Sequence, residues 1–175
     1  MKSLIWVYLL VFVVLKCLPS NAFAESSYVL PYPSAMPGSI FYRLNLIREE
    51  ILRYWYFGDF GGFHFNLKQS DKYLVEAKTL FDYKQYLLAH KALQKSDKYF
   101  KEIYPYILSA KENGKDITDK EKILKSASHK HIEELVKIKE NVPVVFDWVP
   151  EKSSPTTLRL WEALDESIKQ RKERL

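Results

Sequence analysis

The sequence predicts an all-α protein, a single bundle of four to five helices preceded by an extended proline-rich N-terminal arm. Two observations support this prediction. Apolar residues recur at spacings of three and four along most of the chain, as on the buried side of a helix, and no segment reads convincingly as a strand. Capping residues, glycines and prolines also stand where such helices would begin and end.

Residues 1–24 have the features of a signal peptide. Lys2 precedes an unbroken apolar run over residues 4–15, which is shorter than the about 20 residues that span a bilayer. The tripeptide Ala-Phe-Ala that ends at Ala24 has the small-x-small form of a cleavage site. We therefore expect cleavage near Ala24 and a secreted or extracytoplasmic mature protein, with an uncleaved membrane anchor as the alternative. Cys17 follows a lysine and not a small residue, so we do not expect a lipoprotein.

The composition excludes several functional classes. Loss of the two leader lysines would leave 25 basic and 22 acidic residues, a net charge of +3 that is not typical of nucleic-acid binding. The single cysteine would leave with the leader, so the mature chain would have no disulfide, no thiolate nucleophile and no thiolate metal ligand. The remaining about 150 residues suffice for one domain with a hydrophobic core.

The mature chain is expected to begin with an arm and one helix. Residues 25–38 contain Pro31, Pro33 and Pro37 and should run extended, ahead of a helical domain over 39–175. Ser39 can cap the first helix. One stripe of this helix is apolar and is expected to face the core: Ile40, Phe41, Leu44, Ile47, Ile51 and Trp55.

The segment 54–65, YWYFGDFGGFHF, combines seven aromatic residues with three of the five glycines and is read as a turn. Its rings have three interpretations: they close the end of the bundle, they contact a protein or an envelope component, or they bind glycan or a membrane interface. Trp55 is expected in the core, and Phe60 and Phe63 on the surface. The candidate partner-binding residues are Tyr54, Tyr56, Phe60 and Phe63.

Two further helices, over 64–81 and 83–111, should pack as a hairpin, the second bent or interrupted at Pro105. Both contain Ser-Asp-Lys-Tyr, at 70–73 and 96–99, within apolar stripes of the same spacing. An ancient duplication would explain this similarity. We favour a simpler explanation, in which two lysine-rich helices face the same core.

The C-terminal third predicts two more helices. Gly114 should end the preceding helix, and Thr118 with Glu121 forms a capping box for a helix that stops before Pro143. A strap follows over 142–154. Ser154 and Pro155 should start the last helix, whose apolar positions are Leu158, Trp161, Leu164 and Ile168. The basic tail over 169–175 suits the negative end of a helix dipole, and attraction to an anionic envelope is the alternative.

Catalytic and metal-binding patterns are absent from the sequence. His129 and His131 are two apart on a helix, so their rings diverge, and Glu134 near His131 lacks a matching motif elsewhere. These histidines, and the adjacent acid pairs 49–50 and 133–134, are interpreted as solvent-facing surface residues. Asp59-Phe60-Gly61 matches a kinase tripeptide without the other kinase motifs. We expect no enzyme, no metal and no cofactor.

One short motif resembles an uncharacterised family of bacterial exported proteins, a domain of unknown function. Its residues are Leu30, Pro31, Pro37, Gly38, Ser39, Tyr42, Leu44, Arg53, Trp55 and Phe57. The similarity covers residues 28–110, and this chain departs from the family in its glycine-aromatic turn. The resemblance implies export, a helical fold and bacterial origin, and it implies no activity and no site residues.

Taken together, these observations predict an exported, non-enzymatic helical protein that interacts with an unknown protein or cell-envelope component. The alternative is binding of envelope glycan or of a membrane interface through segment 54–65. No nucleic acid and no small-molecule cofactor are expected as partners, and membrane contact is expected only through the signal segment before cleavage.

Overall fold

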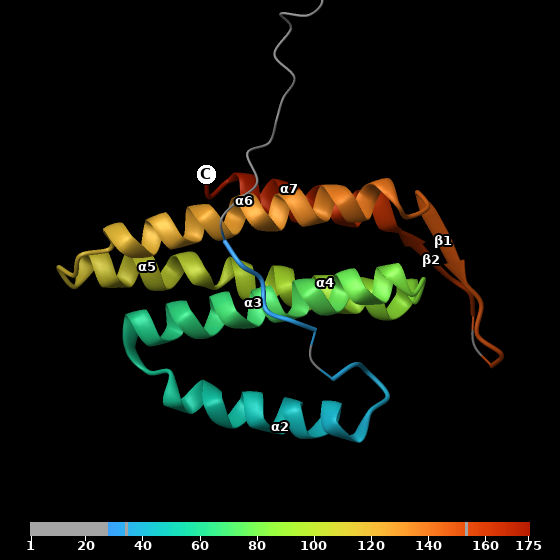
Figure 1. Ribbon diagram of the computed structural model, residues 1–175, viewed down its shortest axis with the longest axis horizontal. Helices are drawn as coiled ribbons and strands as arrows, with labels where there is room; N and C mark the ends of the chain where they lie inside the picture. The colour runs from blue at the N-terminus through green and yellow to red at the C-terminus, as the bar shows by residue number, and fades with distance from the viewer. Residues whose placement is uncertain (1–27, 34, 153) are drawn as a thin grey trace, which may run out of the picture.

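The computed structural model describes residues 28–33, 35–152 and 154–175, and within them it confirms the predicted helical bundle. The expected signal peptide lies outside the described residues. Figure 1 shows helices α2 (Ile40–Trp55), α3 (Gly58–Asp82), α4 (Tyr86–Lys101), α5 (Ile103–Glu112), α6 (Thr118–Glu140) and α7 (Leu160–Lys172). Strands β1 (Val145–Trp148) and β2 (Thr156–Arg159) form an antiparallel hairpin between α6 and α7.

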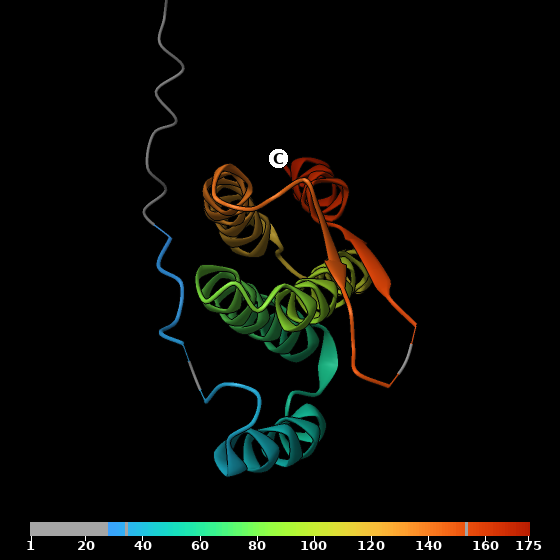
Figure 2. The same ribbon diagram turned by 90° about the vertical axis from the view of Figure 1, so that its right-hand side faces the viewer.

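The helices form layers, as the end-on view in Figure 2 shows. One layer holds α6 and α7, the next holds α3 with α4 and α5, and α2 lies beyond that second layer, apart from the other helices. The hydrophobic core lies between the first two layers. One core cluster contains Leu74, Leu93, Leu135, Leu160 and Leu164, and the other contains Phe63, Leu67, Phe100, Ile103, Ile107 and Leu124.

The predicted hairpin of two similar helices is present. α3 packs along both α4 and α5, which together correspond to the predicted third helix. The interruption comes at Glu102. In a continuous helix the ring of Pro105 would conflict with the carbonyl of Lys101. In the first turn of α5, by contrast, the missing N–H of Pro105 costs nothing. The sequence therefore predicted the break correctly to within one turn.

Of three predicted helix boundaries, two are confirmed and one was wrong. Ser39 caps α2 as expected, its hydroxyl accepting the Phe41 N–H at 3.2 Å. Gly114 follows α5 with a φ of 69°, the left-handed conformation that ends a helix. The capping box at Thr118 was wrong, because the carboxylate of Asp116 accepts the Thr118 N–H at 3.0 Å and takes that role.

The expected absence of strands was also wrong, as was the start of the last helix at Ser154. Residues 156–159 pair with 145–148, and α7 begins only at Leu160. Phe146 and Leu158 are paired across the hairpin and pack against the core. Each strand has four residues, too short for a period of two to stand out in the sequence.

The described part of the arm, 28–33 and 35–38, contains neither helix nor strand, as expected for a proline-rich segment. Figure 1 shows it running across the helices, from α6 towards α2. It is attached at its start, where the Tyr28 hydroxyl donates to Asp71 Oδ2 at 2.6 Å. Leu30 and Met36 pack against the core. The arm therefore covers one side of the bundle before the chain enters α2.

Candidate functional site

The aromatic segment 54–65 is the junction between α2 and α3. The chain reverses over Tyr56 and Phe57, and α3 begins at Gly58, whose φ of 74° lies in the left-handed region that favours glycine. The prediction that the second helix begins near His64 was therefore wrong by nearly two turns. The other glycines of the segment lie inside the helix and not in a turn.

Close packing explains the two helical glycines. A Cβ on Gly61 would lie 2.8 Å from the carbonyl carbon of Tyr56, so a side chain there would collide with the backbone of the reversal. A Cβ on Gly62 would lie 2.2 Å from the ring of Tyr106 on α5. The glycines thus allow the start of α3 to pack closely against its neighbours.

The structure separates the four residues proposed for partner binding: Tyr54, Tyr56, Phe60 and Phe63. Phe63 is completely buried and extends the core stripe of α3 by one turn below Leu67, so its expected exposure was wrong. Phe60 is half-buried, with the ammonium groups of Lys115 and Lys120 at 5.5 and 5.3 Å from its ring centre. Tyr56 is half-buried against Phe65. Only Tyr54 is fully available to a partner.

The exposed apolar surface lies instead along α2. We call it the α2 apolar face, made up of Ile40, Phe41, Leu44, Ile47, Ile51, Tyr54 and Trp55, whose side chains are 55 to 78% exposed. The stripe that the sequence places on one side of this helix is present. The expectation that it faces the core was wrong, and Trp55, 74% exposed, is not a core residue.

The opposite side of α2 explains this orientation, because it is polar and binds polar groups on α3. Glu49 is the one residue of α2 that is buried. Its carboxylate forms an ion pair with Lys72 and accepts the Tyr73 hydroxyl at 2.8 Å. The Tyr42 hydroxyl donates to Glu76 at 3.0 Å. The interpretation of Glu49 as an ordinary surface charge was therefore wrong. It is the main attachment of α2 to the bundle.

Partial burial shifts the pKa values of the ionisable groups that attach α2 to the bundle. Burial and the neighbouring Glu76 carboxylate raise the pKa of Tyr42, and burial and the hydrogen bond to Glu49 raise the pKa of Tyr73. Burial also raises the pKa of Glu76. Both tyrosines therefore remain protonated donors, and they hold the polar side of α2 against the bundle.

Exposed arginines border the α2 apolar face. Arg43 and Arg48 are exposed beside it, as is the acid Glu50 close to Arg43, whereas Arg53 is exposed on the side opposite the stripe. At 100° per residue, Arg43 and Arg48 lie on either side of the stripe centred on Ile51. The outward side of α2 is consequently apolar along its middle and has a guanidinium group at each edge.

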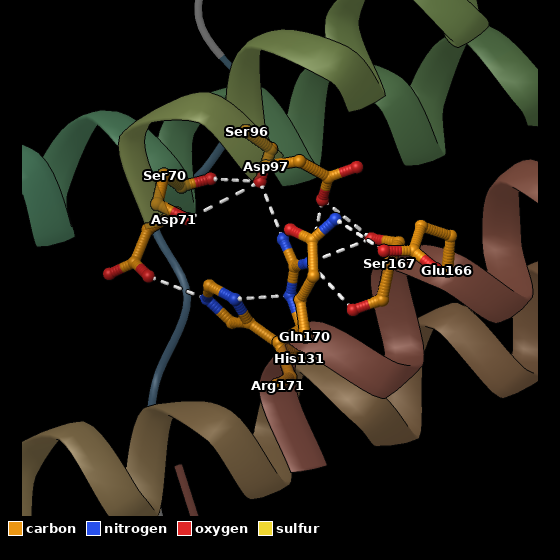
Figure 3. Close-up of polar contacts among 9 residues, drawn as sticks. All are labelled: Ser70, Asp71, Ser96, Asp97, His131, Glu166, Ser167, Gln170 and Arg171. Atoms are coloured by element: carbon orange, nitrogen blue, oxygen red, sulfur yellow. Dashed lines mark hydrogen bonds and ion pairs between the residues drawn. The ribbon is translucent and has the colours of Figure 1, made fainter. Parts of the chain in front are cut away.

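A second notable site is a buried polar network at the centre of the bundle, where four helices meet (Figure 3). Its residues are Ser70 and Asp71 of α3, Ser96 and Asp97 of α4, His131 of α6, and Ser167 and Arg171 of α7. Arg171 has no exposed surface. It donates to Asp97 at 2.6 Å, to the Ser96 hydroxyl at 3.0 Å and to His131 Nδ1 at 3.1 Å.

The hydrogen bonds define the protonation of His131. Its Nδ1 accepts from Arg171, so the ring proton is on Nε2 and is donated to Asp71 Oδ1 at 2.7 Å. Burial lowers the pKa of this completely buried histidine, which agrees with a neutral ring. The interpretation of His131 as solvent-facing was wrong, and Arg171 does not belong to an exposed basic tail.

The repeated Ser-Asp-Lys-Tyr motifs were the sequence signal for this network. The Ser96 hydroxyl donates to the Ser70 carbonyl at 2.9 Å across the α3–α4 contact. The next residue of each motif, Asp71 and Asp97, binds His131 and Arg171 respectively. Arg171 lies seven residues after Leu164 and three after Ile168, spacings that place it on the buried side of α7, a signal that the sequence analysis missed.

The network offers no reactive group to a substrate. Its histidine and arginine are fully buried, and the carboxylate oxygens of Asp71 are occupied by His131 and Tyr28. Glu134, taken from the sequence as surface charge, is buried and paired with Lys78 and Lys130. Among residues 28–33, 35–152 and 154–175, no cluster of three histidine, cysteine, aspartate or glutamate side chains is placed to hold a metal ion.

No protein-family model matches this sequence, and no curated protein or solved structure is significantly similar to it. The resemblance to an exported family therefore depends on the sequence motif alone. Within the part of the chain that the structure describes, no helix combines the length and the hydrophobicity needed to cross a membrane.

Proposed function

We propose that this chain is an exported, non-catalytic helical module that attaches to a component of the cell envelope through the α2 apolar face. One observation carries this proposal: α2 turns the seven side chains of the α2 apolar face outward and the carboxylate of Glu49 inward. Single exposed apolar residues are common on proteins, but a contiguous apolar stripe usually marks an interaction site.

The polar attachment of α2 supports a docking role. Rotating α2 to bury its stripe would leave Glu49 without Lys72 and Tyr73, and the groups that α3 presents there are themselves polar. The part of α3 that binds Glu49 and Tyr42 therefore offers this helix polar partners in place of an apolar surface. A partner that covers the stripe would supply the missing burial, worth about 25 cal/mol for each Å² of apolar surface removed from water.

The buried network supports a module without catalysis. The most reactive constellation, around His131, is sealed inside the bundle, where it joins four helices. Buried ionic groups of this kind can specify one arrangement of helices over others, the role we propose for them here.

The alternative of glycan binding through segment 54–65 has less support. Of the rings in that segment, Phe63 and Phe65 are buried, Phe60 lies beneath two lysines, and the exposed rings are Tyr54, Trp55 and Phe57. The middle of the exposed stripe on α2 is aliphatic, and aliphatic side chains lack the flat ring face on which a sugar stacks.

A matched pair of leucine substitutions tests the proposal. Leu44 on α2 is 58% exposed and Leu108 on α5 is 43% exposed, so Leu44→Ser and Leu108→Ser should both melt like the wild type. In co-sedimentation of the exported protein with isolated envelopes, Leu44→Ser should bind about tenfold more weakly, because a buried leucine contributes about 1.5–3 kcal/mol. Leu108→Ser should bind normally. Equal binding by the two variants would refute the role of α2.

A further inference from the structure

We infer that the occupant of the α2 apolar face is the surface of a bilayer containing anionic lipid, on which α2 lies parallel to the membrane plane. This inference depends on the proposed function and names the partner of the same surface. Three properties of α2 point to it: the composition of its stripe, the charges at its edges, and the way in which the bundle holds it.

The composition of the stripe matches a helix that lies in a membrane interface. Such helices carry bulky aliphatic and aromatic residues on one side and cationic residues beside them. In α2 the middle of the stripe is aliphatic, with Leu44, Ile47 and Ile51, and its C-terminal end carries Tyr54 and Trp55. Tyrosine and tryptophan are the residues that prefer the headgroup level, where a ring can be apolar on one side and hydrated on the other.

The charges at the edges select an anionic surface. Helical geometry places Arg43 about 80° to one side of the stripe and Arg48 about 60° to the other, so both guanidinium groups can reach headgroups while the stripe is buried. Glu49 does not oppose them, because it is turned to the bundle and paired with Lys72. The exposed charges at these edges are the two arginines and the acid Glu50, which lies about 20° around the helix from Arg43.

The same charges argue against a second copy of the chain as the occupant. Two α2 helices packed stripe to stripe would bring Arg43 and Arg48 of each copy to the edges of one contact. The stripe is also small: a 16-residue helix is about 24 Å long and about 10 Å wide, which falls short of the about 800 Å² that each partner buries in a stable interface. A bilayer needs no matching surface and accepts a convex ridge.

The bundle holds α2 in the orientation that this contact requires. Figure 2 shows α2 at the edge of the molecule, with the other helices all on one side of it. Lys72 and Tyr73 bind Glu49 on the inner side, and the apolar residues are left on the outer side. The whole length of the stripe can therefore meet a flat surface without contact between the bundle and that surface.

Vesicle binding by the exported form of the protein tests the inference. The probes are vesicles of phosphatidylcholine alone and of phosphatidylcholine mixed with phosphatidylglycerol, and the variants are Ile47→Ser/Ile51→Ser, Arg43→Gln/Arg48→Gln and the control Leu108→Ser. All substituted side chains are exposed, so the variants should fold. The wild type and all variants have the same N-terminus, so differences in vesicle binding among them report on the substituted residues.

The wild type and Leu108→Ser should bind the mixed vesicles and bind pure phosphatidylcholine much more weakly. Ile47→Ser/Ile51→Ser should bind the mixed vesicles at least about tenfold more weakly. Arg43→Gln/Arg48→Gln should bind the mixed vesicles about fivefold more weakly for each arginine removed, and high salt should abolish this difference from the wild type. The fluorescence of Trp55, which is 74% exposed in the free protein, should shift to the blue on binding, and Trp55→Phe should lose that shift.

Other outcomes separate this inference from the proposed function. The wild type could bind neither kind of vesicle and still bind envelopes in a manner that Leu44→Ser weakens. This outcome would overturn the lipid inference and leave a protein as the partner. A dimer in solution that Ile47→Ser/Ile51→Ser abolishes would overturn it in favour of a second copy. Vesicle binding unchanged by both α2 double variants would also overturn it. Envelope binding unchanged by Leu44→Ser would instead refute the proposed function.

Discussion

Replacing Asp97 with alanine should destabilise the protein far more than the same change at Asp165. Both aspartates form an interhelical ion pair of nearly equal length: Asp97 with Arg171 at 2.6 Å and Asp165 with Lys139 at 2.5 Å. The two pairs differ in burial. The side chain of Arg171 is completely buried, and that of Asp165 is 59% exposed. The comparison therefore sets a buried ion pair beside an exposed one in the same bundle.

The magnitudes follow from what each substitution leaves behind. Asp97→Ala leaves the Arg171 guanidinium charged inside the bundle and removes the acceptor of the Ser167 hydroxyl, a loss of about 3–5 kcal/mol. Asp165→Ala leaves Lys139 free to bind water, a loss of about 0.2–1 kcal/mol. At about 2–4 °C per kcal/mol for a domain of this size, the melting temperature should fall by about 6–20 °C in the first variant and by less than about 4 °C in the second.

Urea unfolding followed by far-ultraviolet circular dichroism measures both losses, at low salt and at high salt. The small effect of Asp165→Ala should shrink with salt, because the exposed pair is screened, while the effect of Asp97→Ala should persist. A loss in Asp97→Ala no larger than in Asp165→Ala would refute the reasoning, since it would mean that Arg171 reaches water or another acceptor. The wild-type slope of free energy against urea should hold in both variants.

Three further predictions concern side-chain burial, the charge of His131 and cleavage of the leader. Phe63→Ala should cost about 3–5 kcal/mol and Trp55→Ala less than about 0.5 kcal/mol in urea unfolding, and the reverse order would contradict the observed exposure of α2. Burial lowers the pKa of His131 in the folded state, so its contribution to stability is complete above pH 6.5 and is lost as the pH falls towards that lower value. Urea titrations over this range should show a decline, and stability that rises on acidification would contradict a neutral buried ring. N-terminal sequencing of the exported protein should begin at Glu25, and retention of Met1 would contradict the predicted leader.

Much of the secondary structure could be predicted because its causes are local. The spacing of apolar residues along α2 and α3, the cap at Ser39 and the left-handed glycine at Gly114 act within a few residues of one another, and the structure bears them out. The short hairpin could not be predicted in this way. Its strands are stabilised by pairing with each other and by packing of Phe146 and Leu158 on the core, contacts between residues distant in the sequence.

The candidate sites show the same division. The position of Ile47, Ile51 and Trp55 on one side of a helix is a property of the sequence, since helical geometry alone determines which residues share a side. The direction of that side depends on what the neighbouring surface offers. Because α3 presents Lys72 and Tyr73 to α2, Glu49 turns inward and the apolar residues turn outward.

The polar network illustrates this division from the inside of the bundle. The sequence determined that Ser70 and Ser96 lie at equivalent points of two similar stripes, but it gave no reason to connect them with His131 or Arg171. Those residues meet only when four helices pack together, and burial then makes a histidine neutral and an arginine dependent on Asp97. Local spacing decides which side chains share a face. Tertiary packing decides which faces lose their water, and the loss of water sets the energy of every polar and apolar group on them.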